Sequence, residues 1–322
     1  MKSTKNFKIA VLGTGSIGRR HLRILNEIGV STIAVPARKE RLFELKKDGF
    51  KTATTLEEAK RMGAVGVIIC TDTGRHINDC LTALNLDLLV LCEKPLATSK
   101  EEALKIESLI SGNLFVGYNL RYDSGFQTLF NIKSEIGEFF YIYSECRSYL
   151  PEWRKNVNYL ESYSARENEG GVILDLSHEI DYLCYFYGIP ENVFGVRRNF
   201  GILGIKGEEF ASAIFDYKDS LAVVTIDYIS RNPVRRCILS AKNGDATYDF
   251  LSEKLIINHE GKEKIMEFKR KPDELYRKEL EEFIGIINGE RRQFLGTYEE
   301  SLNVLKVVDC WKGCKIFKGD CP

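Results

Sequence analysis

The chain has 322 residues, in which 46 lysines and arginines balance 46 aspartates and glutamates, and 44% of the residues are hydrophobic. At roughly 100–200 residues per domain, this length predicts two domains, each able to bury a core of its own. The balanced charge excludes the basic stripe with which nucleic-acid-binding proteins neutralise phosphates. We therefore expect no nucleic-acid partner.

The beginning of the sequence and its cysteines indicate a compartment. The first residues, MKSTKNFKIAVLG, pass from a short basic segment into a strand-like run without the apolar core or cleavage site of a secretory signal. The longest apolar runs hold about seven residues, far short of the ~20 needed to span a bilayer. Nine cysteines, several of them in apolar segments, are typical of a reducing environment. These features predict a cytoplasmic protein with no membrane contact.

One cysteine pair has a spacing that metal sites also use. Cys310 and Cys314 form a CxxxC on an expected helix, with Cys321 close by in the sequence. A tetrahedral site needs four ligands, and neither a histidine nor a second cysteine pair lies nearby. We predict no metal.

The first part of the chain alternates short β-branched runs with longer helical patterns, the order that produces a parallel sheet covered by helices. Strands are expected at Phe7–Leu12, Thr32–Val35, Lys51–Ala53, Val65–Cys70, Leu88–Cys92 and Leu114–Tyr118. Thr55 with Glu58, and Ser99 with Glu102, have the spacing of capping boxes that open helices. We predict a doubly wound α/β domain of the Rossmann type over residues 1–121.

After Tyr122 the expected strands become longer and follow one another without helices, as in an antiparallel sheet with one covered face. The clearest strands are Phe139–Tyr149, Glu209–Tyr217, Leu221–Ser230 and Arg235–Ala241. Helices are expected at Gly171–Tyr187, Glu274–Asn288 and Tyr298–Lys315. We predict an α+β domain with a large, mostly antiparallel open sheet over residues 122–322, with a cleft beside the junction.

Gly13, Gly15 and Gly18 form the sequence GTGSIG directly after the first expected strand and at the start of a helix. In a dinucleotide-binding loop the first glycine allows a tight turn, the second lets the pyrophosphate approach the backbone, and the third packs helix on strand. The helix N-terminus supplies free N–H groups for the phosphates. The alternative is that the three glycines form an ordinary turn, which would not explain the strand before them and the helix after them.

The choice between NAD and NADP depends on the residues after the second strand. An NAD-binding protein places an acid there to hold the ribose 2′-OH. Here Val35–Lys39 reads VPARK, with no acid before Glu40. Arg38 and Lys39 therefore favour NADP(H), because they can pair with a 2′-phosphate. The alternative is that Arg38 stacks on the adenine of either cofactor, which keeps NAD(H) possible.

Lys94 follows a strand of the parallel sheet, at the edge where such sheets bind ligands. It can donate a hydrogen bond to a substrate hydroxyl or carbonyl oxygen, and Pro95 can fix the turn that aims it. A lysine at a strand end is otherwise commonly solvated. Its place where the nicotinamide should lie favours catalysis.

The helix expected after Gly171 carries the second group of candidates. At about 100° per residue, Asp175, His178, Glu179 and Tyr182 form one polar stripe. His178 is the general acid/base candidate near neutral pH, and Asp175 can orient it or stabilise its charge. A His–Asp pair on a helix is also commonly structural, and that alternative stays open.

Tyrosines and charged residues alternate along the strand Phe139–Tyr149, where a period of two places them on one face. These are Tyr141, Tyr143, Glu145, Arg147 and Tyr149, followed by Trp153, Arg154, Tyr163 and Arg166. Such cations and rings suit a phosphorylated or carboxylated sugar. The alternative is a solvated loop with ordinary surface arginines.

Four segments together resemble one family. GTGSIGRRH, EKPL, GYNLRY from Gly117 to Tyr122, and GGVILDLSHEID from Gly170 to Asp181 are similar, in this order, to the glucose-fructose oxidoreductase/inositol dehydrogenase (Gfo/Idh/MocA) family. The resemblance covers nearly the whole chain. It implies NAD(P)-dependent hydride transfer at a hydroxyl-bearing carbon of a sugar, cyclitol or nucleotide-sugar, with Lys94 and His178 nearest the reacting oxygen. It also implies a homodimer or homotetramer formed through the open sheet.

Two features refine this resemblance. The segment from Ser148 to Gly171 resembles a branch of the family associated with bacterial surface-glycan and acidic-sugar pathways. Many members separate the aspartate and histidine by four residues, whereas Asp175 and His178 are three apart. On a regular helix, this spacing would rotate His178 by about 100° relative to the histidine of those members. Glu179 or Tyr182 is therefore a candidate to share proton transfer.

These arguments assign a role to each candidate residue. Catalysis is assigned to Lys94, His178 and Asp175. Cofactor binding is assigned to Gly13, Gly15, Ser16, Ile17, Gly18, Arg38, Thr71, His76, Glu93, Lys94 and Asn119. Substrate binding is assigned to Arg121, Arg147, Tyr149, Trp153, Tyr163 and Tyr182. The rival function is a catalytically silent NADP(H)-sensing regulator, and imine or enone reduction is a rival reaction.

Overall fold

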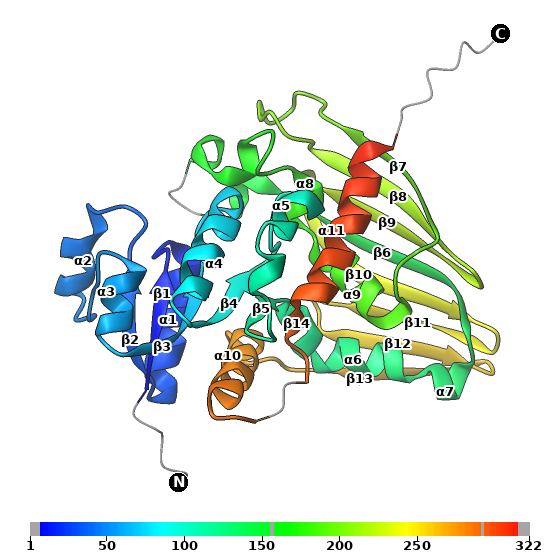
Figure 1. Cartoon of the computed structure of the whole chain (residues 1–322). Coiled ribbons are helices and arrows are strands. Elements are labelled where there is room, and N and C mark those ends of the chain that lie inside the picture. Colours follow the sequence, from blue (N-terminus) through cyan, green and yellow to red (C-terminus); the bar gives the residue numbers. More distant parts are fainter. Residues whose placement is uncertain (1–6, 155–157, 291–292, 315–322) are drawn as a thin grey trace. The chain divides into compact units, whose positions relative to one another are not determined.

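The chain forms two compact units in a computed structural model that describes residues 7–154, 158–290 and 293–314 (Figure 1). The first unit combines Met1–Tyr122 with Lys271–Leu302, and the second combines Asp123–Arg270 with Asn303–Pro322. Among the described residues, every helix is too short or too polar to traverse a lipid bilayer.

A six-stranded sheet in the order β14-β5-β4-β3-β1-β2 forms the centre of the first unit. The parallel strands are β1 (Lys8–Leu12), β2 (Ser31–Val35), β3 (Ala64–Ile69), β4 (Leu89–Glu93) and β5 (Leu114–Gly117). The short β14 (Gly296–Thr297) pairs antiparallel with β5. The predicted Rossmann sheet is confirmed.

One predicted strand of this sheet was wrong. The segment Lys51–Ala53 forms only an isolated bridge between Thr52 and Ala34. The sixth strand is instead β14, which comes from the far end of the chain. Two residues carry no periodic pattern, so the sequence offered no signal for this strand.

The helices of the first unit are α1 (Ser16–Ile28), α2 (Arg41–Lys47), α3 (Leu56–Arg61), η1 (Thr73–Arg75), α4 (His76–Asn85), α5 (Lys100–Leu104), η2 (Glu107–Leu109), η3 (Asn119–Tyr122) and α10 (Glu274–Ile287). Two of them, α3 and α5, begin at the predicted capping residues. The side chain of Thr55 accepts from the Glu58 N–H, and that of Ser99 accepts from the Glu102 N–H. Each satisfies a donor that a helix start leaves without an intrahelical partner.

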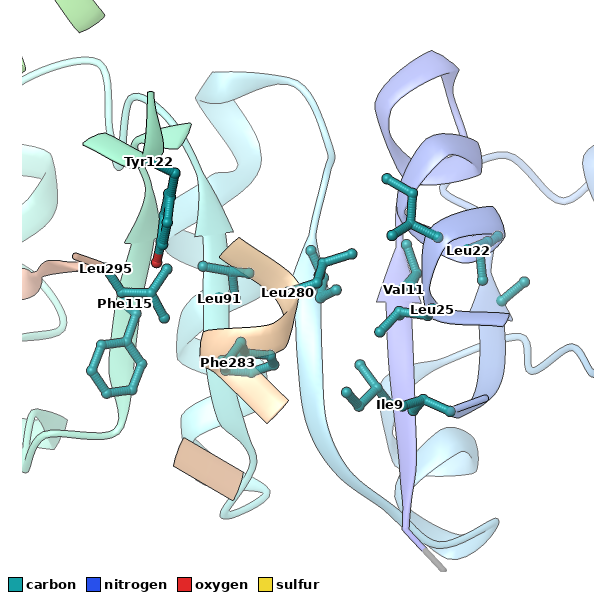
Figure 2. Packing of buried hydrophobic residues seen from close by; sticks show 14 of the residues in the cluster. Ile9, Val11, Leu22, Leu25, Leu91, Phe115, Tyr122, Leu280, Phe283 and Leu295 are labelled. Carbon is teal, nitrogen blue, oxygen red and sulfur yellow. The ribbon is translucent and has the colours of Figure 1, made fainter. Parts of the chain in front are cut away.

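Helix α10 packs in the core of the first unit, although it follows the whole second sheet in the sequence. Its Leu280 and Phe283 are fully buried in a cluster with Ile9, Leu91 and Phe115 (Figure 2). Burying each such side chain is worth roughly 1.5–3 kcal/mol. The sequence placed this helix with residues 122–322, but its apolar face is buried with residues of the parallel sheet.

The second unit is built on an eight-stranded sheet in the order β13-β12-β11-β10-β6-β9-β8-β7. The strands are β6 (Phe139–Tyr149), β7 (Asn192–Arg198), β8 (Phe210–Tyr217), β9 (Ser220–Asp227), β10 (Ile229–Ala241), β11 (Gly244–Asp249), β12 (Lys254–His259) and β13 (Lys262–Glu267). All neighbours pair antiparallel except β6 with β9. The predicted α+β class is confirmed, and four strands are added to those predicted.

Helical segments connect the strands of the second unit. They are α6 (Ser124–Asn131), α7 (Lys133–Ile136), η4 (Leu150–Glu152), η5 (Tyr159–Glu161), η6 (Tyr163–Ala165), α8 (Val172–Asp175) and α9 (His178–Tyr187). The long α11 (Tyr298–Gly313) begins in the residues of the first unit and ends in those of the second.

The single helix predicted over Gly171–Tyr187 was wrong. Helix α8 ends at Asp175 and α9 begins at His178, because Leu176 leaves helical geometry with φ −99° and ψ 32°. A constant turn of 100° per residue therefore does not relate Asp175 to His178. The single polar stripe predicted for Asp175, His178, Glu179 and Tyr182 therefore does not exist as one helix face. The surroundings of these residues follow from their observed contacts.

In the part of the second unit that the structure describes, one face of the sheet carries no helix, and an aligned row of side chains crosses it. In register from β7 to β13 these are Phe194, Ile214, Val223, Tyr143, Ile238, Thr247, Ile256 and Ile265. We call them the cross-strand row; all but Thr247 are aliphatic or aromatic. Ser144, next to Tyr143, points the other way and bonds Tyr182 of α9.

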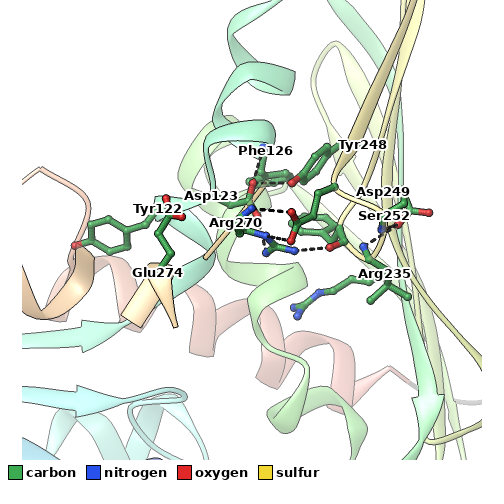
Figure 3. A network of polar contacts seen from close by, with 12 residues as sticks. Tyr122, Asp123, Phe126, Arg235, Tyr248, Asp249, Ser252, Arg270 and Glu274 are labelled. Atoms are coloured by element: carbon green, nitrogen blue, oxygen red, sulfur yellow. Dashed lines mark hydrogen bonds and ion pairs between the residues drawn. The ribbon is translucent and has the colours of Figure 1, made fainter. Parts of the chain in front are cut away.

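Asp123 organises a buried polar network in the second unit (Figure 3). Its Oδ1 accepts from the Phe126 N–H at 3.0 Å, which caps α6, and from the Tyr248 hydroxyl at 2.8 Å. Its Oδ2 accepts from Arg270 Nη1 at 2.8 Å. Asp123 is 0% exposed, so a helix start, a sheet tyrosine and a charged side chain share one acceptor.

We expect Asp123→Asn to lower the free energy of unfolding by about 2–3 kcal/mol, because Arg270 loses a charged hydrogen-bond partner in a mostly buried place. Urea denaturation of the full chain measures the change. Asp249→Asn is the matched control, because Asp249, at the end of β11, has only backbone N–H donors of the following turn among the described residues. An equal loss of stability in both variants would contradict this account of the network.

Candidate active site

The three glycines of the first loop have different spatial reasons. Gly13 has φ +88°, and a Cβ there would meet the Cys70 backbone at 2.6 Å. A Cβ on Gly18 would lie 1.9 Å from the Gly13 oxygen. At Gly15 a Cβ would meet only Arg41, at 4.0 Å. Gly13 and Gly18 therefore leave no space for a side chain, whereas the space beside Gly15 can hold another molecule.

The start of α1 provides hydrogen-bond donors beside that space. Gly15 is the N-cap, in an extended conformation, and no side chain bonds the cap. Ser16 and Ile17 are the first residues of the helix, whose earliest N–H groups have no intrahelical acceptor. Free N–H groups and the positive end of a helix dipole suit the phosphates of a dinucleotide. The residues present therefore fit this cofactor.

Arg41 is a contact of this loop that the sequence did not indicate. Its Nη1 donates to the Thr14 oxygen at 2.8 Å, which connects the first residue of α2 to the glycine loop. Arg38 and Lys39 are exposed between β2 and α2. Three cations therefore lie among the six residues that follow β2. The sequence signal that could have indicated Arg41 was its position three residues after Arg38.

His76 connects the ends of two parallel strands. Its Nδ1 lies 2.8 Å from the Pro95 oxygen and its Nε2 lies 2.9 Å from the Thr71 oxygen. Burial lowers the pKa of His76 below its ordinary value, and a neutral ring donates to only one of two carbonyls. Both ring nitrogens of this predicted cofactor ligand thus face backbone atoms of the first unit. Thr71 also donates its hydroxyl to Asp79, at 2.7 Å.

Lys94 stands directly after β4, half-buried, and is joined to Pro95 by a cis peptide bond. Its neighbour Glu93 is placed by α1, because Glu93 Oε1 lies 2.7 Å from Nε2 of the fully buried His21. The glycine helix and the lysine-bearing turn are thereby held together within the first unit.

The surroundings of Glu93 offer three potential metal ligands. One atom each of His21, Cys70 and Glu93 lies within 4.8 Å of the others. Burial raises the pKa of Cys70 well above its ordinary value, which favours the thiol over the thiolate that binds metals. Burial, followed by Glu93, also raises the pKa of Glu279. The geometry of this cluster is that of a hydrogen-bonded His21–Glu93 pair with the Cys70 thiol beside it.

Two predicted ligands lie on η3, close after β5. Asn119 is 8% exposed, and Arg121 is 1% exposed with Nη1 3.0 Å from Glu300 Oε2. The Arg121 guanidinium also lies 5.3 Å from the centre of the Tyr118 ring. The charge of this predicted substrate ligand is therefore paired inside the first unit.

In the second unit, Asp175 ends α8 and His178 begins α9. Both side chains are mostly buried, with 3% and 9% exposed. Oδ2 of Asp175 accepts a hydrogen bond from the Tyr228 hydroxyl at 2.6 Å. The break between the two helices places the Asp175 carboxylate at the end of α8 and the His178 imidazole at the start of α9. Their positions therefore do not follow from the spacing of residues along one helix face.

Glu179 and Tyr182 instead hold α9 against the sheet. Glu179, 0% exposed, accepts from Arg235 Nε at 2.8 Å, and the Tyr182 hydroxyl bonds Ser144. Burial raises the pKa of Tyr182 well above its ordinary value, so its proton is held tightly. Both groups have partners on the strands under α9.

The predicted substrate ligands of the second unit fall into two groups. Arg147 Nε is 2.9 Å from Glu145 Oε2, on the helix-free face of β6, and Arg231 lies 3.5 Å from the centre of the Tyr149 ring. Trp153 bonds Ser148 at 2.8 Å, and its ring lies 5.3 Å from that of Tyr228. The structure therefore brings Trp153 into the surroundings of Asp175 and places Arg147 on the opposite face.

Tyr163 also belongs to the Asp175 group. It lies close enough to contribute to the raised pKa of Tyr228, after burial and Asp175. A Cβ on Gly170 would lie 2.2 Å from the Tyr163 oxygen, so η6 packs tightly against the start of α8. A small pocket next to this segment is lined by Leu150, Pro151, Trp153, Arg154, Tyr159, Ser162 and Ser164.

Tyr228 and Glu208 are site residues that sequence reasoning missed. Glu208 Oε1 accepts from the Ile173 N–H at 3.2 Å, and its backbone oxygen accepts from the Val172 N–H at 3.1 Å. It therefore holds the start of α8, as Tyr228 holds its end. Neither residue belongs to a motif, so the sequence carried no local signal for them.

The CxxxC pair lies at the end of α11, where Cys310 belongs to the helix and Cys314 follows its last residue. Sγ of Cys314 lies 3.4 Å from the Val193 oxygen and 3.4 Å from the Cys310 oxygen, and its single proton can be donated to one of them. Cys321 lies outside the described residues.

The glycine loop and sheet define a dinucleotide-binding Rossmann unit. Residues 7–112 match a family described as "Oxidoreductase family, NAD-binding Rossmann fold". The resemblance to the Gfo/Idh/MocA family is thereby confirmed for this part of the chain, which matches the family's NAD-binding Rossmann fold.

Relatives and solved structures extend this comparison. An inositol 2-dehydrogenase from Leifsonia xyli is 25% identical over 202 residues, which cover 59% of this chain and 56% of that protein. The match thus spans little more than half of that relative. The structure of UDP-N-acetylglucosamine 3-dehydrogenase from Acidithiobacillus ferrooxidans has a TM-score of 0.79 at 20% identity, covering 95% of this chain and 97% of the other. Levoglucosan dehydrogenase with NADH and levoglucosan reaches 0.84 at 14% identity, covering 96% and 97%. These two structures share the fold.

Proposed function

We propose that this protein is an NAD(P)-dependent oxidoreductase that transfers a hydride at a hydroxyl or carbonyl carbon of a sugar, cyclitol or nucleotide-sugar. The observation that carries the proposal is the open space at Gly15 beside the uncapped start of α1, in the same unit as the lysine-bearing turn. The names of the inositol, levoglucosan and UDP-N-acetylglucosamine dehydrogenases support a hydroxylated substrate.

The proposed mechanism divides the work among the chain's own residues. The loop from Gly13 to Gly18 binds the pyrophosphate with backbone N–H groups, and Arg38 and Lys39 pair with a 2′-phosphate. The bound dinucleotide supplies the hydride chemistry. Lys94 donates a hydrogen bond to the oxygen on the reacting carbon, and His178 accepts or returns its proton. Asp175 orients His178 and stabilises its charge.

We expect Lys94→Ala and His178→Ala each to lower kcat by ~10²-fold or more, because both groups act on the oxygen whose charge changes in the transition state. Cofactor affinity should stay nearly unchanged. Coupled absorbance assays over a panel of sugars, cyclitols and nucleotide-sugars, with calorimetry for the cofactor, make the measurement. Lys51→Ala and His259→Ala are the matched controls.

A different assignment of the acid/base would show in the same assays. Full turnover by His178→Ala together with loss of turnover in Tyr182→Phe or Glu179→Gln would move the role to that residue. Cofactor binding by the unmodified protein without turnover of any substrate would favour the NADP(H)-sensing regulator. Turnover of imines or enones alone would change the reaction.

We expect NADP(H) to bind more tightly than NAD(H), because Arg38 and Lys39 occupy the place where an acid would hold the 2′-OH. Ala37→Asp should reverse this preference by placing a carboxylate against the 2′-phosphate. Ala37→Asn is the control, since it has the same shape without the charge. Calorimetry that finds NAD(H) the tighter ligand of the unmodified protein would refute the preference.

We also propose that the helix-free sheet face binds a second copy of the chain. The cross-strand row exposes Phe194 by 60%, Ile214 by 42% and Ile265 by 54%, and contiguous apolar surface of this kind is typical of an interface. A face-to-face contact matches row to row, as a two-fold axis requires.

Ile214→Glu together with Val223→Glu should convert the oligomer to a monomer, because unpaired carboxylates would be buried in the contact. Sedimentation velocity measures the change. The control is Leu251→Glu, an exposed leucine outside the row. A monomeric unmodified protein would refute the interface.

The cellular setting of the proposal is a reducing cytoplasm, as all eight cysteines in the described part of the chain are free. The narrower setting is bacterial surface-glycan biosynthesis, with an acidic or phosphorylated sugar as substrate.

A further inference from the structure

Tyr228 is held rigidly between β9 and β10. Its side chain is 0% exposed, its N–H donates to the Glu209 oxygen at 2.9 Å, and its oxygen accepts from the Leu150 N–H at 2.9 Å. The Trp153 ring meets it edge-on, at 84°. With the backbone bound on both sides and the ring packed, the phenol oxygen has one position.

That oxygen lies beside two acceptors. Oδ2 of Asp175 is 2.6 Å away, and the backbone oxygen of Gly171 is 2.9 Å away. A phenol has a single proton, so it cannot give a full hydrogen bond to both. Burial, followed by Asp175, raises the pKa of Tyr228 well above its ordinary value, so the phenol keeps that proton.

Both acceptors are satisfied in either protonation state of Asp175. When Asp175 is ionised, the phenol donates to the carboxylate, and the Gly171 oxygen keeps the Asp175 N–H at 3.2 Å. When Oδ2 carries a proton, the carboxyl group donates to the phenol oxygen, and the phenol donates to Gly171. The same three groups thus form hydrogen bonds whether Asp175 holds a proton or not.

We propose that Tyr228 is a positioning residue that stabilises Asp175 in both protonation states by reversing the direction of their hydrogen bond. The proposal rests on the proposed function, in which Asp175 serves His178. In either state Oδ2 of Asp175 stays hydrogen-bonded to Tyr228, so the carboxyl group that serves His178 keeps its position. The Tyr228 proton turns from Asp175 to Gly171 and back without leaving its oxygen, so the count of protons is unchanged.

The kinetic test replaces the phenol alone. Tyr228→Phe should lower kcat by roughly 10- to 100-fold, within the range of a lost proton-transfer aid, and should increase the solvent deuterium isotope effect on kcat. KM for the sugar and cofactor affinity should stay nearly unchanged. Tyr217→Phe is the matched control, because its buried hydroxyl has no hydrogen-bond partner among the described residues. Equal isotope effects in Tyr228→Phe and the unmodified enzyme would overturn the proposal.

Neutron diffraction tests the reversal without relying on turnover. In deuterated crystals at high pH, the deuterium on Tyr228 should point to Asp175. At low pH it should point to Gly171, with a second deuterium on Oδ2 of Asp175. A deuterium that points to the same acceptor in both crystals would refute the reversal. If the unmodified protein turns over no substrate, the proposed function fails, while the diffraction result still decides the hydrogen-bond reversal.

Discussion

The cost of burying a polar group without a partner determines much of this structure. An unsatisfied buried donor or acceptor costs about 1–3 kcal/mol, and more when it is charged, whereas a whole domain is stable by only about 5–15 kcal/mol. Asp123, Glu179 and Arg121 are each at most 1% exposed. Each has a charged partner at 2.8–3.0 Å. These pairs fix where α6, α9 and η3 begin or lie.

The same constraint separates structural from chemical candidates among the polar residues. Glu179 and Tyr182 each have a hydrogen-bond partner on the strands of the second unit, which accounts for their place on α9 without catalysis. Asp175 differs because its partner, Tyr228, stands beside a second acceptor. A group whose hydrogen bonds can be arranged in two ways is suited to changing its protonation state.

In the first unit, backbone geometry rather than side-chain chemistry shapes the candidate site. Gly18 cannot carry a Cβ because the Gly13 oxygen would lie 1.9 Å from it, whereas Gly15 leaves its surroundings open. The pair of His21 and Glu93 then connects the glycine helix to the turn that bears Lys94. The loop, the helix start and the lysine are therefore parts of one rigid arrangement within this unit.

The sequence by itself determined the glycine loop, the capped helix starts, the parallel strands and the α+β character of the second unit, because local signals over a few residues encode these features. Only the tertiary structure decided the partners. His21 and Glu93 are 72 residues apart, and Asp175 and Tyr228 are 53 apart. No local pattern relates such positions, and the helix break at Leu176 depends on packing that Tyr228 and Glu208 provide from other strands and loops. The same reason applies to α10, which packs in the core of the first unit. Its apolar stripe could cover either sheet, and only the tertiary structure shows that Leu280 and Phe283 are buried with the parallel strands.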